Sequence, residues 1–164
     1  MKNIIEITAG KERFADLLLI GDEQEEMIAK YLDRGRLFVM TDNENVYAAC
    51  VVTDEGDATL ELKNIAVYPQ YQHMGFGKEL ISFIENKFAA EYRRLIAGTG
   101  DSPLTVPFYE KCGFKRSGVI KDFFIDNYDH PIIEAGVRLC DMICFEKELP
   151  SDDRTDREGF AEKR

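Results

Sequence analysis

Long apolar runs are absent from this sequence. The longest unbroken run, residues 46–52, is far shorter than the roughly 20 residues that a membrane-spanning helix needs. Residues 1–8 alternate like a strand and lack the apolar stretch and small-residue cleavage site of a secretory signal. The sequence therefore predicts a protein that does not enter a membrane and that resides in the cytoplasm.

Basic residues are also scarce. The chain has 21 Lys and Arg against 31 Asp and Glu, a formal net charge of -10, and no basic block. Nucleic-acid binders draw much of their affinity from clustered Lys and Arg, so we expect no nucleic-acid partner. The acidic residues keep the surface soluble, and they would also attract cationic small molecules or basic peptide segments. Both interpretations stay open.

The patterns of a metal site are missing as well. The chain has four cysteines and two histidines, and none of the cysteines forms a C-x-x-C pair. We therefore expect no metal, and reduced, mostly buried thiols. These residues are Cys50, Cys112, Cys140, Cys144, His73 and His130.

What is present fits one domain of ordinary size within 164 residues. We expect this domain at 1–149 and a mobile polar tail at 150–164. Periodicity predicts helices at 11–20, 22–33, 75–92 and 106–111, and strands at 1–8, 36–40, 46–53, 58–67, 94–97, 114–121 and 137–145. The strand and helix alternation from residue 58 onward predicts an α/β fold with a mixed sheet and helices on both faces.

The strand predicted at 58–67 is irregular. Leu60 and Leu62 are apolar in one phase of the alternation, whereas Ile65 and Val67 are apolar in the other. A β-bulge near residues 63–64 produces such a slip and leaves backbone groups unpaired. A strand end buried on both faces would give the same pattern, so both interpretations stay open.

A glycine-containing loop joins this strand to the next helix. Backbone N–H groups at a helix start bind anions, and glycines let the backbone approach a phosphate closely, so a phosphorylated cofactor is implied. A P-loop would need glycine at Gln72 and Ser or Thr at Glu79, and a dinucleotide fingerprint would need glycine at Leu80. Both alternatives are excluded.

The loop does resemble a known motif. Gln72, Gly75 and Gly77 are similar to the Q/R-x-x-G-x-G/A motif of GNAT superfamily N-acetyltransferases, and residues 108–114 resemble that family's helix-to-strand segment. The resemblance covers residues 60–114. It implies a GNAT-like, mainly antiparallel central sheet and acetyl-CoA as acetyl donor.

The resemblance also implies how acetyl-CoA is bound. Backbone groups of one strand segment would pair with the pantetheine arm, and main-chain N–H groups of the loop would surround the pyrophosphate. Lys78 would add charge, and Ser102 stands where many relatives have an asparagine that contacts the cofactor. The implied cofactor-binding residues are Ile65, Ala66, Val67, Gln72, His73, Met74, Gly75, Phe76, Gly77, Lys78 and Ser102.

Acetyl transfer to an amine needs a neutral amine, a polarised carbonyl and a protonated leaving sulfur. The resemblance implies Tyr109 as the general acid, although its ring would also suit packing under Phe114. It implies Glu61 as the base, although an exposed strand glutamate fits equally. Cys112 at a helix end is more typical of packing than of an acetyl-cysteine intermediate, which favours direct transfer. His130 is either an acceptor-site residue or a turn residue.

Two functions remain at this stage. The first is an N-acetyltransferase that acts in a ternary complex on a primary amine of a small molecule or peptide. The alternative is a non-catalytic regulatory module that binds acetyl-CoA or CoA. The acceptor is not identified, and a long final strand could pair across a homodimer.

Overall fold

The computed structural model describes residues 1–150. Apart from Pro150, the tail predicted at 150–164 therefore lies outside the described residues. The strands are β1 Asn3–Ile7, β2 Arg36–Thr41, β3 Val46–Gly56, β4 Thr59–Val67, β5 Arg94–Gly100, β6 Lys115–Ile120, β7 Ile133–Glu134, β8 Val137–Arg138 and β9 Met142–Glu148. The helices are the 3-10 turns η1 Lys11–Phe14 and η2 Pro69–Tyr71, and α1 Ala15–Gly21, α2 Glu25–Ala29, α3 Phe76–Phe88, α4 Val106–Lys111 and α5 Phe123–Asn127. No helix within residues 1–150 combines the length and apolar character that crossing a bilayer requires.

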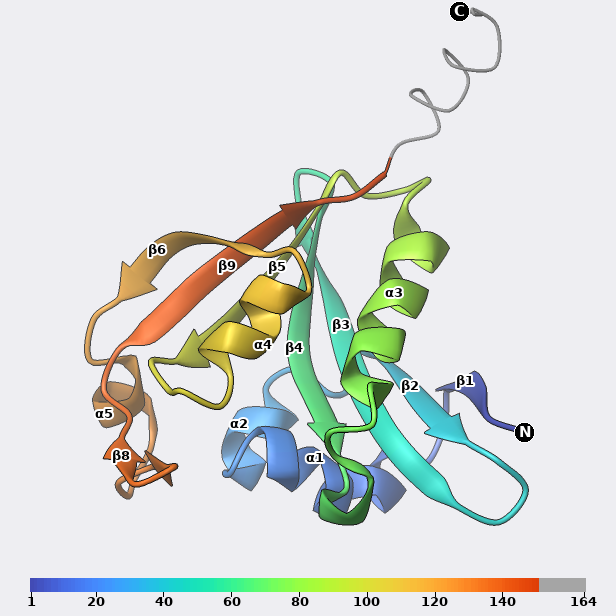
Figure 1. Ribbon diagram of the computed structural model, residues 1–164, viewed down its shortest axis with the longest axis horizontal. Helices are drawn as coiled ribbons and strands as arrows, with labels where there is room; N and C mark the ends of the chain where they lie inside the picture. Colours follow the sequence, from blue (N-terminus) through green and yellow to red (C-terminus); the bar gives the residue numbers. More distant parts are fainter. Residues whose placement is uncertain (151–164) are drawn as a thin grey trace, which may run out of the picture.

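A 7-stranded sheet in the order β1-β2-β3-β4-β5-β9-β6 forms the centre of the fold (Figure 1). Neighbouring strands are antiparallel except β4 and β5, which are parallel. The predicted α/β fold with a mixed, mainly antiparallel sheet is confirmed. The final strand β9 lies between β5 and β6, so the idea that it offers a free edge to a partner chain is wrong.

Helices cover both faces of the sheet, as predicted. On one face Leu80, Ile84 and Phe88 of α3 are buried, because their spacing along the helix places them on one apolar stripe. On the other face, Leu18 of α1 and Ile28 of α2 are buried in a separate cluster. The centre of the sheet therefore has two apolar faces, and its strands β2 and β3 contain nearly continuous buried apolar segments.

The irregularity in β4 is a β-bulge. Positions 51 and 52 of β3 pair with positions 64 and 62 of β4, so Lys63 has no partner in β3. Leu62 before the bulge and Ile65 after it both pack on the cluster that contains α3, whereas Ala66 packs on the cluster with α1 and α2. The first of the two sequence interpretations is confirmed.

Strands β4 and β5 pair only along part of their length. The parallel ladder joins Thr59–Leu62 to Arg94–Ala97. Beyond it β4 continues to Val67 and β5 to Gly100, and the two strands diverge (Figure 1). The backbone edge of β4 at 63–67 therefore faces a gap in the middle of the sheet.

The strand predicted at 137–145 is wrong in its first part. Residues 137–138 instead form a hairpin with β7, turned by Ala135 and Gly136 at φ of 52° and 78°. Leu139 then leaves the strand direction because its side chain is buried and its N–H bonds the Ile132 carbonyl at 2.8 Å. The sheet strand begins only at Met142.

Helix boundaries also differ from the predictions. The segment 22–33 forms an α-helix only at Glu25–Ala29, followed by turns that end in a bond from the Gly35 N–H to the Tyr31 carbonyl at 2.8 Å. The segment 11–20 begins as a 3-10 turn before α1, and α3 ends at Phe88. Helix α5 was not predicted.

Candidate active site

The loop between β4 and α3 is held by local contacts. The Gln72 side-chain amide donates to the Val67 carbonyl at 2.9 Å, which fixes the loop to the end of β4. The Tyr71 ring packs edge-on against Tyr47, with 4.6 Å between ring centroids. His73 and Gly75 both have left-handed backbones, with φ of 65° and 87°, and turn the chain into the helix.

Backbone N–H groups of residues 73–78 donate to no acceptor within residues 1–150. The first backbone bond after them runs from the Glu79 N–H to the Gly75 carbonyl at 3.0 Å. A run of free N–H groups at a helix start is an anion site. Gly77 keeps it compact, because a Cβ there would lie 3.0 Å from the Phe108 ring. The predicted pyrophosphate cradle fits these residues.

A cavity of about 1320 Å³ begins at this loop. Its walls include residues 62–67 of β4 and 98–100 of β5, so it passes through the gap between the two strands. It continues to residues of α1, α2 and α5 on the other face of the sheet. Its volume exceeds the roughly 300–1,000 Å³ of most small-molecule pockets, which suits two ligands bound together.

Most of the predicted cofactor-binding residues line this cavity. Those that do so are Ile65, Ala66, Val67, Gln72, His73, Gly75, Phe76, Gly77 and Lys78. Met74 is 60% exposed and is not part of the wall. Ser102 is also outside the wall, and its buried hydroxyl accepts a bond from the Leu104 N–H at 3.1 Å. The structure therefore places Ser102 as a support for the segment that leads into α4.

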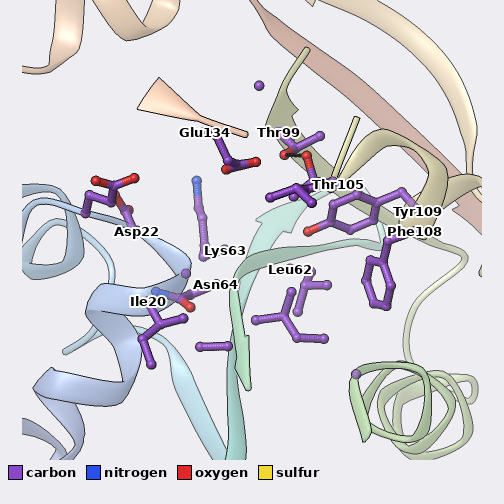
Figure 2. A pocket seen from close by; sticks show the side chains of 18 of the residues that line it. Ile20, Asp22, Leu62, Lys63, Asn64, Thr99, Thr105, Phe108, Tyr109 and Glu134 are labelled. Carbon is purple, nitrogen blue, oxygen red and sulfur yellow. Dashed lines mark hydrogen bonds between the residues drawn. The ribbon is translucent and has the colours of Figure 1, made fainter. Parts of the chain in front are cut away.

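Tyr109 lies at the cavity on the α4 side. Its ring stacks on Phe145 and meets Phe114 edge-on, each with 5.4 Å between centroids. Its hydroxyl points into the cavity (Figure 2) and forms no hydrogen bond within the described chain. Burial, aided by the charges of Cys112 and Glu134, raises its pKa above the ordinary 10.0. Tyr109 is therefore protonated at neutral pH, and its ring packs against Phe114 as the packing interpretation expects.

The sequence of the central region decides the family. Residues 33–116 match the profile of the Acetyltransferase (GNAT) domain. The chain belongs to the GNAT acetyltransferase family. Membership of this family supports an acyltransferase activity with acetyl-CoA as co-substrate.

Several relatives resemble this GNAT domain closely. The Bacillus subtilis (strain 168) protein called uncharacterized N-acetyltransferase YvbK is 33% identical over 130 residues, covering 78% of this chain and 84% of that protein. The crystal structure of a GNAT family acetyltransferase from Elizabethkingia anophelis with acetyl-CoA bound has 37% identity and a TM-score of 0.82, covering 90% of this chain and 98% of that one. The IAA acetyltransferase from Bacillus cereus ATCC 14579 has 33% identity and a TM-score of 0.84, covering 91% and 100%.

Glu61, the predicted base, has a different environment from Cys112 and His130, which were not predicted as catalytic residues. Glu61 lines the cavity, half-buried, and its Oε1 lies 3.1 Å from Lys63 Nζ. Burial raises the pKa of the Cys112 thiol, which disfavours the thiolate that a covalent route needs. His130 is exposed, is not part of the cavity wall, and contacts Asp129 with 2.6 Å between Nδ1 and Oδ1.

Sequence reasoning missed a polar cluster in the cavity wall, where α1, α2 and α5 lie. Asp22 accepts hydrogen bonds from the hydroxyls of Tyr128 at 2.6 Å and Tyr31 at 3.1 Å. Asn64 at the bulge donates to the Tyr31 hydroxyl at 3.0 Å. Burial raises the pKa of Asp22, and its bonds to the tyrosines oppose the shift. No local motif marks this cluster, since Asp22 and Tyr128 are 106 positions apart.

A metal site has no support in the described part of the chain. No group of three or more His, Cys, Asp or Glu side chains among residues 1–150 is placed to hold a metal ion.

Proposed function

We propose that this GNAT protein transfers an acetyl group from acetyl-CoA to a primary amine of a small molecule or peptide, with both ligands bound together in the cavity. One observation carries the proposal: a single cavity connects the free N–H groups of residues 73–78 with the hydroxyl of Tyr109. An anion-binding site and a proton donor thus line the same cavity. The Elizabethkingia anophelis relative, which has acetyl-CoA bound, supports this choice of donor.

Residues of the loop and β4 would hold the donor. The free N–H groups of 73–78 bind the pyrophosphate, and Lys78 adds positive charge at the same end of the cavity. The backbone edge of β4 at 63–67 faces the gap between the strands and pairs with the amide groups of the pantetheine arm. Acetyl-CoA supplies the acetyl group as a thioester, which is activated for transfer to an amine.

Tyr109 would supply the proton that the departing sulfur needs. Its hydroxyl is protonated, lies in the cavity and has no hydrogen-bond partner within residues 1–150, so it is free to donate. The raised pKa of Cys112 supports direct transfer without an acetyl-cysteine intermediate.

The test is a Tyr109→Phe substitution. The phenyl ring keeps the packing on Phe145 and removes only the proton donor, so we expect turnover to fall by about 10²-fold or more. CoA release would be measured as free thiol with 1-aminobutane, 1,4-diaminobutane, glycinamide and a peptide with a free N-terminus. Affinity for CoA, measured by calorimetry, should not change.

Tyr92→Phe provides a matched control. This substitution also removes a tyrosine hydroxyl, which donates to Asp54 at 2.9 Å. Tyr92 is not part of the cavity wall, so the variant should keep full turnover. If acetyl-CoA raises the melting temperature of the wild type but no amine ever releases CoA, the regulatory-module alternative replaces the enzyme. If neither CoA nor acetyl-CoA binds, the proposed cradle is wrong.

A further inference from the structure

Glu134 lies on a hairpin that closes the acceptor side of the cavity. It pairs with Val137 beside the turn at Ala135 and Gly136, whose positive φ angles suit a two-residue hairpin. The hairpin is anchored by Leu139, which is buried against Gly100 so closely that a Cβ at position 100 would lie 2.5 Å from the leucine side chain. The Glu134 side chain therefore projects from a short, well-fixed element.

One carboxylate oxygen of Glu134 is buried without a partner. Among residues 1–150, the buried side-chain N and O atoms without a hydrogen bond belong to Asn64, Glu85 and Glu134. Glu85 forms an ion pair with Lys147 at 2.5 Å, and Asn64 is held through its side-chain NH₂ group. An unpaired buried carboxylate oxygen is costly to the folded state, so its presence in a cavity wall indicates a place for a ligand cation.

Glu134 and Tyr109 face the same part of the cavity. Figure 2 shows the Glu134 carboxylate, the Tyr109 hydroxyl and the Lys63 side chain directed into the cavity from different elements. The charge of Glu134 contributes to the raised pKa of Tyr109, so the two groups interact electrostatically. The proton donor and this carboxylate thus line the same cavity from two separate elements.

The other acidic side chains of the wall have protein partners or a different position. Glu61 of β4 is paired with Lys63, and Asp22 accepts bonds from Tyr31 and Tyr128. The further ionisable groups that share the wall are Glu23, Lys30, Arg34, Tyr71, His73, Lys78, Lys111 and Cys112. Among the acids of the acceptor side, Glu134 is therefore the one that combines a buried free oxygen with proximity to Tyr109.

We propose that Glu134 binds the ammonium group of the acceptor and accepts its proton before acetyl transfer. This inference rests on the proposed function and replaces Glu61 as the base. The acceptor ammonium gives one proton to the Glu134 carboxylate, and the neutral nitrogen then forms a C–N bond to the acetyl carbon. The C–S bond breaks with its electron pair on sulfur, which takes the Tyr109 proton. The second proton released by nitrogen restores Tyr109, and Glu134 returns its proton to solvent.

The test compares Glu134→Gln with Glu61→Gln in the full-length protein, with 1-aminobutane and the other amines of the panel as acceptors. Glutamine keeps the size and removes the base, so Glu134→Gln should lower kcat/KM by about 10²-fold or more at neutral pH. Glu61→Gln should lower it less and keep the wild-type pH profile. Glu146→Gln, on β9 and outside the cavity wall, is the matched control and should match the wild type.

The shape of the pH profile separates a base from a structural residue. Wild-type kcat/KM should level off well below the pKa of the free amine, because the bound ammonium form is deprotonated in the site. In Glu134→Gln only the small fraction of free amine in solution can react, so kcat/KM should keep rising about tenfold per pH unit up to about pH 9. Calorimetry gives a second readout: Glu134→Gln should bind CoA as the wild type does, and its CoA complex should bind the best amine of the panel about tenfold more weakly or worse.

Each result has one meaning. A wild type that releases no CoA with any amine contradicts the proposed function itself, and this inference fails with it. An active wild type whose Glu134→Gln variant keeps the levelling pH profile contradicts the role of Glu134 alone. If Glu61→Gln instead shows the continuing rise, Glu61 is the base and our assignment is overturned. A Glu134→Gln protein that no longer binds CoA would show a structural role and would also overturn it.

Discussion

Gly75 occupies a backbone position that other residues adopt at a cost. Its φ of 87° is left-handed, and a Cβ added there would meet nothing within 4 Å. The requirement for glycine is therefore conformational and not steric. The turn at this residue sets the direction of the free N–H groups that follow it.

We expect Gly75→Ala to lower the free energy of unfolding by about 1–2 kcal/mol and to weaken CoA binding. Both effects follow from backbone strain at the start of α3. Gly118→Ala is the control, because Gly118 has open space for a Cβ and no left-handed φ. Urea unfolding and calorimetry with CoA would measure both variants. Equal losses of stability in the two variants would contradict the conformational argument.

At the residue scale, most loop residues that line one end of the cavity could be predicted from the sequence, and the residues at the other end could not. Gln72, Gly75, Gly77 and Tyr109 belong to short motifs whose geometry is determined locally by turns and helix starts. Glu134 faces the cavity only because the hairpin anchored by Leu139 packs on the end of β5. That contact joins distant parts of the chain, and no spacing in the sequence encodes it.

Among the elements, the bond between Asp22 after α1 and Tyr128 after α5 joins two segments across the acceptor side of the cavity. The Asp129 N–H adds a second link, to the Gln24 side chain at 3.2 Å. The segment around α5 is thus held against α1 and α2 by polar bonds. The loss of one of these hydrogen bonds should therefore weaken binding of the acceptor and leave the affinity for CoA unchanged.

We expect Tyr128→Phe to raise KM for the acceptor and to leave CoA affinity unchanged. It should lower stability by about 1 kcal/mol at pH 7, because a half-buried Asp22 oxygen loses its donor. The folded-state pKa of Asp22 lies above 3.8, mainly through burial, so its contribution to stability is full below that value and is lost as pH rises through the folded pKa. Removing the tyrosine bond raises that pKa further. The stability loss measured by thermal unfolding should therefore be larger at pH 7 than at about pH 4, and an equal loss at both would contradict this reasoning.

Elements that depend on a local sequence pattern were predicted, whereas elements that depend on packing against distant residues were not. The β4 bulge at Lys63 could be predicted because a slip of apolar phase within one strand is visible in the sequence. The strand at 137–145 was wrong because the two-residue turn at Ala135 and Gly136 lacks the usual Asn-Gly or Asp-Gly signal. Helix α5 is only Phe123–Asn127 and has no long apolar period, so its presence depends on the packing around it.

For the molecule as a whole, several exposed carboxylates make stability sensitive to acid. Hydrogen bonds lower the pKa of Glu6 through Arg36, of Asp42 through Tyr47, of Asp54 through the Gly56 N–H and of Glu55 through Thr53. A pKa below its unfolded value means that the folded state binds fewer protons. Their contribution is present above the unfolded values of 3.8 and 4.5 and is lost as pH falls through the folded values.

We therefore expect the melting temperature to fall as pH is lowered from about 5 to about 3. Glu6 joins β1 to β2 through two bonds to the Arg36 guanidinium, at 2.8 and 2.9 Å. Glu6→Gln should be less stable than the wild type at neutral pH and should lose stability less steeply in acid. Differential scanning calorimetry at several pH values checks this, and parallel curves for the two proteins would contradict it.

The cavity is a product of the whole sheet. It exists because β4 and β5 pair along Thr59–Leu62 and Arg94–Ala97 and then separate, while each keeps its other neighbour. The sequence predicted a mixed sheet but not where pairing between β4 and β5 would stop. The cytoplasmic location and the homodimer stay predictions.

Lys63 also limits how the chain can change in length. The turn at 42–45 joins β2 to β3, and residues added there would only enlarge a loop. Deleting residue 63 would remove the bulge and leave Leu62 and Ile65 two positions apart, so Ile65 would still face the layer that contains α3. A residue inserted into the paired ladder beside the bulge would instead turn Ile65 and Val67 away from that layer and exchange the surfaces offered by Asn64 and Ala66. The unpaired position therefore lets β4 be one residue longer than a regular ladder while both of its halves face the correct layers.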